Sequence, residues 1–301
     1  MCQNFEGGLN LDITVLIPTM NEPAVQDVIK DVFKALEDDH NVNVIVIDKS
    51  SDDTPIRAEQ AGARVIFQLA RGYGDAYLTG FKYATGDIIV MLDGDRTYDP
   101  MDIPSLLEPI LREQADFVLG NRFANLKEGA MSYRNKLGNK TITAFVNRLY
   151  ELQISDSQSG MRAFKKDMLD DVNLDLKGMP FATEMIIEAR RAGVRIAEVP
   201  ISYYPRVGSA KLRAFRHGAS IFGTLLRMLR DYNPLLLFGS IGFFLIISGI
   251  LVGLLPVFGW IISGSTTNLR LTIFSVLLIL SGLQVLLFGL MADVLVRKFH
   301  Q

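Results

Sequence analysis

The hydrophobic and polar positions of this 301-residue chain divide it into two unlike parts. In the first, up to about residue 230, short apolar runs alternate with charged and polar stretches. Four of these runs are apolar, rich in β-branched residues and of strand length: 13–17, 42–47, 63–67 and 87–92. The segments 23–36 and 74–84 between them read as helices. Strands that alternate with helices predict an α/β domain with a mostly parallel, twisted sheet.

The second part contains two long apolar runs that predict a transmembrane hairpin. Residues 235–262 carry no formal charge, and a second uncharged run begins at 271. A helix over the first run would reach about 42 Å, which exceeds the roughly 30 Å hydrocarbon core of a bilayer. The alternative, a buried hairpin in a soluble protein, is disfavoured because soluble helices rarely run so long without charge.

Charges around the hairpin predict its orientation. Basic residues gather on the outer sides of the two runs, at Arg227, Arg230, Arg297 and Lys298, whereas the connector has only Arg270. The positive-inside bias therefore places both ends in the cytoplasm, in a multi-pass protein of the cell membrane. The N-terminus lacks a basic region followed by an apolar stretch, so no signal peptide is expected.

We therefore expect three regions. A cytosolic catalytic domain would span 1–206, an interfacial segment 207–232 and the hairpin 233–301, with spans at about 235–262 and 271–295. Basic and apolar residues alternate at helical spacing in the interfacial segment, which suits the headgroup layer of an anionic leaflet. Packing of this helix against its own domain is the alternative.

Composition excludes some classes of function. The net charge of −2 gives no reason to expect a nucleic-acid partner. A single cysteine, Cys2, excludes an intramolecular disulfide and a cysteine-built metal site.

The segment Arg71–Gly74 resembles a phosphate-cradling turn before a helix, but Tyr77 breaks the Gly-x-Gly-x-x-Gly pattern of dinucleotide binding.

Polar clusters follow three of the expected strands. They are Asn21 and Glu22; Asp48, Ser50 and Asp52; and Asp93 and Asp95. Because ligands of open α/β sheets bind beyond the carboxyl ends of the strands, these clusters predict a ligand cleft.

The pair Asp93 and Asp95 is the sharpest chemical feature, because both carboxylates can approach one hard cation. Mg²⁺ or Mn²⁺ beside a substrate diphosphate suits such a pair, although acidic turns after strands are common. Asp48 is a candidate contact to a nucleobase or ribose, or simply a turn residue.

The order of the motifs resembles family 2 glycosyltransferases. The first four are Ile-Pro-Thr-Met-Asn-Glu (17–22), Val-Ile-Asp-Lys-Ser-Ser-Asp-Asp-Thr (46–54), Arg-Gly-Tyr-Gly-Asp-Ala (71–76) and Met-Leu-Asp-Gly-Asp (91–95). Four more resemble the dolichyl-phosphate mannose synthase branch with its prokaryotic polyprenyl-phosphate hexosyltransferases: Gly-Asn-Arg-Phe (120–123), Asp-Ser-Gln-Ser-Gly-Met-Arg-Ala-Phe (156–164), Phe-Ala-Thr-Glu-Met (181–185) and Pro-Arg-Val-Gly-Ser-Ala-Lys-Leu (205–212).

The resemblance implies a GT-A-type nucleotide-sugar-binding domain with Mg²⁺ or Mn²⁺ as cofactor. Asp93 and Asp95, with Thr97 as a weaker candidate, would hold the metal. The residues expected to contact the nucleotide sugar are Pro18, Glu22, Asp48, Arg71, Gly94, Arg162, Glu184, Arg206 and Lys211.

On the acceptor side, the resemblance implies that Arg122 and Arg134 bind a phosphate and act with Asp95 in catalysis. Three departures from the mannose enzymes stand out. Thr97 replaces a usual glutamine, Gly138 replaces a common serine and leaves Asn139 as its substitute, and Lys211 is spaced unusually. These departures favour a relative over a close copy, and Thr97 favours a UDP-sugar donor.

The function that the resemblance implies is transfer of a hexose from UDP-Glc, UDP-GlcNAc or GDP-Man to polyprenyl (dolichyl) phosphate, with inversion. The product would be a lipid-linked monosaccharide for glycan or glycoprotein assembly, and a homo-oligomer through the hairpin is compatible with it. Two alternatives remain: transfer to a hydroxyl in polysaccharide synthesis, and a non-catalytic membrane scaffold.

Overall fold

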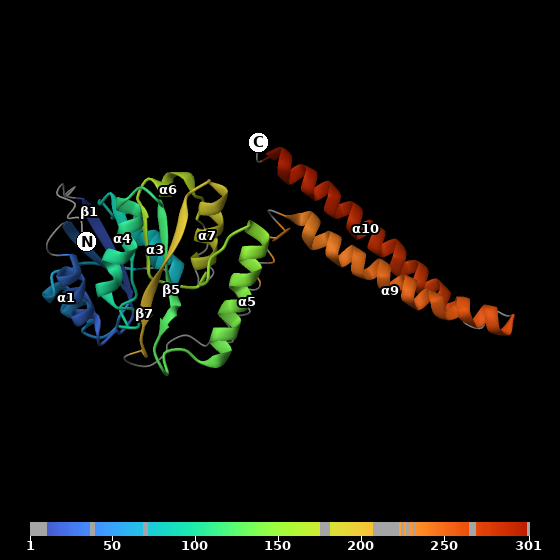
Figure 1. The fold of residues 1–301 in the computed structure, drawn as a ribbon, viewed down its shortest axis with the longest axis horizontal. Helices are drawn as coiled ribbons and strands as arrows, with labels where there is room; N and C mark the ends of the chain where they lie inside the picture. The colour runs from blue at the N-terminus through green and yellow to red at the C-terminus, as the bar shows by residue number, and fades with distance from the viewer. Residues whose placement is uncertain are drawn as a thin grey trace, which may run out of the picture. The chain divides into compact units, whose positions relative to one another are not determined.

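The computed structural model describes residues 11–36, 40–68, 72–174, 181–206, 223, 226, 229–230, 233–264 and 269–299. It divides the chain into two units, Met1–Ile221 and Phe222–Gln301, each described here by itself (Figure 1). Arg71, Lys211 and most of the expected interfacial segment 207–232 lie outside the described residues.

The first unit is built on a seven-stranded sheet in the order β3-β2-β1-β4-β6-β5-β7. The strands are β1 (Asp12–Thr19), β2 (Asn41–Asp48), β3 (Arg64–Phe67), β4 (Ile88–Met91), β5 (Phe117–Leu126), β6 (Arg162–Lys165) and β7 (Ile196–Tyr203). β1 pairs in parallel with β2 and β4, and β5 with β7, whereas β6 is antiparallel to both of its neighbours. The mostly parallel sheet confirms the expected fold class.

Helices cover both faces of this sheet. The described helices of this unit are α1 (Val25–Leu36), α2 (Thr54–Gln60), α3 (Tyr73–Phe81), the 3-10 helix η1 (Pro100–Asp102), α4 (Ile103–Leu111), α5 (Tyr133–Tyr150), α6 (Met168–Asp171) and α7 (Phe181–Arg191).

Successive side chains of β1 pack against opposite helical layers. Ile13, Val15 and Ile17 belong to one buried cluster with the apolar face of α1. Leu16 points to the other side, where it approaches Gly80 of α3. Because both faces are covered, β4 is apolar throughout and β1 is apolar over most of its length, as buried parallel strands usually are.

The second unit contains α9 (Pro234–Ser263) and α10 (Leu269–Phe299), packed side by side (Figure 1). The segments Pro234–Ile262 and Leu269–Val296 contain 18-residue windows with mean hydropathies of 2.6 and 2.4 and are long and apolar enough to cross a membrane. A Cβ on Gly242 would lie 2.6 Å from the carbonyl oxygen of Gly282, so the two backbones approach closely. Small residues at such contacts are typical of membrane helices, and the pair fits the expected hairpin.

A glycine before β4 generates a prediction about stability. A Cβ on Gly86 would lie 2.5 Å from the carbonyl oxygen of Asp12 and 2.7 Å from the amide nitrogen of Thr14, both backbone atoms. We expect Gly86→Ala to lower the free energy of unfolding by about 1–3 kcal/mol, because the strand must shift. In the control Gly138→Ala nothing lies within 4 Å of the new Cβ, and no loss is expected. Thermal unfolding of the full chain in detergent measures this difference. A Gly86→Ala variant with the same unfolding midpoint as the wild-type chain would contradict the prediction.

Candidate active site

Three loops that lie far apart in the sequence converge beyond the carboxyl ends of β1 and β4. Glu22 follows β1, Asp95 follows β4, and Arg206 follows β7. Nη2 of Arg206 lies 2.8 Å from Oε1 of Glu22, and its Nε lies 3.2 Å from Oδ2 of Asp95. One half-buried guanidinium therefore bridges two of the expected donor-site carboxylates.

Backbone and side-chain hydrogen bonds hold the loops after β1 and β2 together. Asp48 accepts from Oγ1 of Thr19 at 2.7 Å and from the amide of Ser50 at 2.9 Å. The side chain of Asn21, whose φ is 53°, accepts from the amide of Ser51 at 2.7 Å. Asp48 is only 1% exposed, and these bonds fit a turn residue. Pro18, one residue before Thr19, is half-buried.

Thr97 fixes the orientation of Asp95. Its amide donates to Oδ1 of Asp95 at 3.0 Å and its hydroxyl donates to the same oxygen at 2.6 Å. Thr97 was the weak metal candidate; the structure instead places its hydroxyl on the aspartate. Gly94 lets this loop lie on β1, because a Cβ there would approach Cγ2 of Thr19 to 2.9 Å.

Asp93 has an incompletely satisfied carboxylate. Its Oδ1 is buried and accepts no hydrogen bond from the part of the chain that the structure describes. Burial and the neighbouring charge of Asp95 raise the pKa of Asp93 to about 7, while Tyr73, Arg206 and Arg122 oppose the shift.

A hard divalent cation fits this arrangement, because it would bind the orphaned oxygen and neutralise two adjacent carboxylates. Within the described ranges no group of three or more His, Cys, Asp or Glu side chains is placed to hold a metal. Asp93 and Asp95 would therefore share the cation with ligands from outside the protein, such as the oxygens of a diphosphate or water.

Gly160 and two tyrosines that the sequence did not single out surround Asp93. A Cβ on Gly160 would lie 2.8 Å from the hydroxyl of Tyr73 and 3.0 Å from Oδ2 of Asp93. The amide of Gly160 donates to the hydroxyl of Tyr98 at 2.6 Å. The segment 156–164 is thus packed against the aspartate, and its glycine leaves room for the carboxylate. Tyr73 lies in the motif Arg-Gly-Tyr-Gly, in which the sequence pattern singles out only the glycines.

Arg122, expected on the acceptor side, is held in a buried ion pair. Its Nε and Nη2 donate to the two carboxylate oxygens of Asp156 at 2.6 and 2.8 Å. The guanidinium also lies 5.2 Å from the ring centre of Tyr203. Two of its donors are thus engaged within the protein.

Arg162, expected near the nucleotide sugar, is fully buried. It donates to three backbone carbonyl oxygens, those of Ser159, Ala182 and Ser157, at 2.8, 2.7 and 3.1 Å. These bonds tie the 157–159 loop to the start of α7, and the guanidinium does not line an open sugar site. Glu184 lies nearly buried in the first turn of the same helix.

The other acceptor candidates lie on α5. Ser132 caps this helix, and its hydroxyl accepts from the amide of Asn135 at 3.3 Å. Arg134 in the first turn is exposed. Asn139 is half-buried, and its side-chain amide lies 3.7 Å from the sulfur of Met131.

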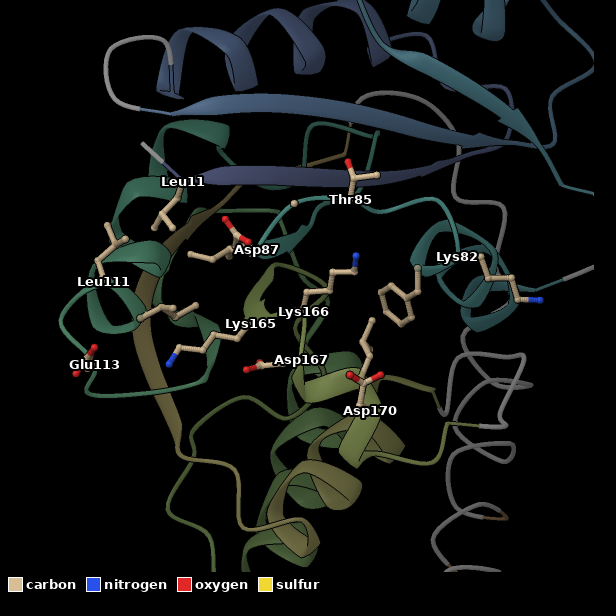
Figure 2. Close-up of a pocket in the computed structure, with 15 residues that line it drawn as sticks. Leu11, Lys82, Thr85, Asp87, Leu111, Glu113, Lys165, Lys166, Asp167 and Asp170 are labelled. Carbon is tan, nitrogen blue, oxygen red and sulfur yellow. The ribbon is translucent and has the colours of Figure 1, made fainter. Parts of the chain in front are cut away.

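A cavity of about 770 Å³ lies elsewhere on this unit, beside the amino end of β4. Asp87, Lys165 and Lys166 are among its lining residues (Figure 2). It contains none of the expected site residues, whereas the carboxylates described above follow the carboxyl end of β4. The chemistry therefore points to the carboxylate cluster and not to this cavity.

The raised pKa of Asp93 predicts how pH affects stability without metal. An unfolded aspartate titrates near pH 4, so the stability that its folded-state protonation provides is full below pH 4 and lost as pH rises through 7. In EDTA, we expect Asp93→Asn to raise the unfolding midpoint over wild type by several degrees at pH 8 and by less at pH 5. The exposed control Asp167→Asn should show the same small difference at both pH values. An Asp93→Asn difference that does not change with pH would contradict the assignment.

Comparisons with known proteins agree with this fold. The family model described as Glycosyl transferase family 2 matches residues 14–172. Glycosyltransferase AglJ of Haloferax volcanii is 35% identical over 96% of this chain and 95% of its own length. The UDP-N-acetylglucosamine–dolichyl-phosphate N-acetylglucosaminyltransferase of Methanococcus voltae is 30% identical over 72% of this chain and 95% of its own.

A solved structure shares the fold of the first unit. Glucosyl-3-phosphoglycerate synthase of Mycobacterium tuberculosis, in complex with Mn²⁺, UDP and glucosyl-3-phosphoglycerate, is 25% identical with a TM-score of 0.58. The match covers 72% of this chain and 79% of that one. With the family match over more than half of its length and a relative that covers nearly all of it, this chain belongs to glycosyltransferase family 2.

Proposed function

We propose that this glycosyltransferase transfers a hexose or N-acetylhexosamine from a nucleoside diphosphate sugar to polyprenyl (dolichyl) phosphate, with a divalent cation and with inversion. The observation that carries the proposal is the convergence of Glu22, Asp93, Asp95 and Arg206 in a chain that also has two apolar helices. The acceptor in the name of the Methanococcus relative and the UDP and Mn²⁺ of the solved neighbour support it.

On the donor side, the cluster offers both the negative and the positive charge that a diphosphate needs. Asp93 and Asp95 would hold the cation, which would supply Lewis-acid stabilisation to a leaving nucleoside diphosphate. Arg206 already lies beside Asp95, and its guanidinium is partly exposed. It can therefore pair with a diphosphate oxygen in place of a carboxylate, because guanidinium groups bind phosphate well.

On the acceptor side, the chemistry needs no general base. A phosphate monoester has its second pKa near 6, so its oxygen is largely ionised at neutral pH. The protein has to hold that oxygen in line with the anomeric carbon, and direct displacement then inverts this centre. The exposed Arg134, with Asn139 on the next turn of α5, is the candidate for that task. Arg122, clamped by Asp156, would add positive charge and order the loops around it.

The two apolar helices suit an acceptor that lives in a bilayer. We propose that α9 and α10 anchor the chain, that the 207–232 segment lies at the membrane surface, and that both termini and the catalytic domain are cytoplasmic. A scaffold role would not require the paired carboxylates, and transfer to a hydroxyl would require a base.

The experiment incubates the full chain in nanodiscs with labelled UDP-Glc, UDP-GlcNAc or GDP-Man, polyprenyl phosphate and Mn²⁺ or Mg²⁺. We expect an acid-labile glycolipid with one donor, and a loss of at least about 100-fold in Asp95→Ala, because charge on the leaving group is no longer stabilised. Asp167→Asn should keep wild-type turnover. Label in polymer instead of lipid, no product with any donor, or full activity of Asp95→Ala would each overturn the proposal.

A second variant tests the acceptor site separately. Arg134→Ala should raise the KM for polyprenyl phosphate about tenfold, the value of one charge-assisted hydrogen bond, and leave the donor KM nearly unchanged. Arg148→Ala, near the opposite end of α5, is the matched control for lost helix charge. Steady-state kinetics with each substrate varied in turn give both constants. An equal rise in both KM values would argue against an acceptor role for Arg134.

A further inference from the structure

Arg96 lies in the loop after β4, between Asp95 and the residue that orients its carboxylate. It follows Asp95 and precedes Thr97, whose amide and hydroxyl both donate to Oδ1 of Asp95. The φ of Arg96 is 61°, a left-handed conformation that glycine and asparagine adopt far more readily. Contacts of the arginine side chain would have to offset the strain of this backbone conformation.

The side chain of Arg96 bridges two carboxylates of α1. Nη1 lies 3.2 Å from Oδ2 of Asp27, and Nη2 lies 3.2 Å from Oδ2 of Asp31. These aspartates are one helical turn apart, where like charges repel each other. The guanidinium therefore relieves a repulsion within α1 and ties the helix to the loop after β4.

The same helix also contacts the other side of the candidate site. The amide of Val25, the first residue of α1, donates to the carbonyl oxygen of Glu22 at 3.4 Å. Glu22 in turn shares Arg206 with Asp95. Arg96 thus joins α1 to the loop that carries Asp95, and Val25 joins the same helix to the loop that carries Glu22.

We infer that Arg96 is a positioning residue: its bridge to Asp27 and Asp31 holds the Asp95 carboxylate in the orientation that binds the divalent cation. The inference rests on the proposed metal-dependent function. Charge alone predicts the opposite effect, because removal of a nearby cationic side chain would favour a bound cation. A weaker metal site in an Arg96 variant would therefore report lost positioning and not lost charge.

The test is Mn²⁺ binding to the metal-free full chain in detergent, with the free ion measured by electron paramagnetic resonance. We expect Arg96→Ala and the double variant Asp27→Asn/Asp31→Asn each to bind Mn²⁺ about 3–10-fold more weakly than wild type, the range that two surface ion pairs can supply. Arg96→Lys should recover part of the loss. The matched control is Arg112→Ala, which breaks an exposed ion pair with Glu108, 2.7 Å long, on α4.

Two further measurements separate the causes. Arg96→Gly relieves the left-handed backbone but removes the bridge, so it should also bind Mn²⁺ more weakly. In 1 M NaCl, which screens exposed ion pairs, the gap between wild type and Arg96→Ala should narrow. Variants that bind Mn²⁺ as wild type does, or an Arg96→Gly variant that binds more tightly, would overturn the inference alone. A wild-type chain that binds neither Mn²⁺ nor Mg²⁺ would overturn the proposed metal site and this inference with it.

Discussion

The repulsion between carboxylates at the carboxyl end of β4 is the constraint on which the rest of the site depends. Asp93 and Asp95 are adjacent and largely removed from water, and burial with mutual repulsion raises the pKa of Asp93 to about 7. Such a pair persists only where positive charge is close. Arg206 supplies part of that charge on Asp95, and Oδ1 of Asp93, which has no hydrogen-bond partner among the described residues, leaves a position for a cation. The glycines at 94 and 160 let the surrounding loops come close enough to enclose the pair.

Burial gives three arginines of this domain different roles. Arg122 and Arg162 are removed from water, and each is held by fixed acceptors, a carboxylate for the first and backbone carbonyls for the second. A buried charge without such partners would be strongly destabilising, so these residues build the walls of the site. Arg206 is half-buried and shares its donors between two carboxylates. It is the one of the three that can change partners when an anionic substrate arrives.

The proposed acceptor chemistry and the two apolar helices support the same proposed function. An acceptor that is already ionised, as in the proposed function, makes a catalytic base unnecessary, and the described part of the site offers carboxylates, arginines and tyrosines around the proposed metal position. A lipid acceptor needs an enzyme that stays at the bilayer, and α9 and α10 are long and apolar enough for that. Their close glycine contacts give the pair its own packing.

The sequence by itself determined the elements and the family. Apolar strands followed by polar clusters placed Glu22, Asp93 and Asp95 at one edge of a parallel sheet, because parallel strands end on the same side. It could not show that β6 is inserted antiparallel, since a strand of only four residues, Arg162–Lys165, carries no sign of its direction. Nor could it show that Arg122 pairs with Asp156, that Arg162 is fully buried, or that Arg96 reaches α1. Charged side chains look alike in a sequence; which of them face water and which face one another is decided only when distant segments pack together.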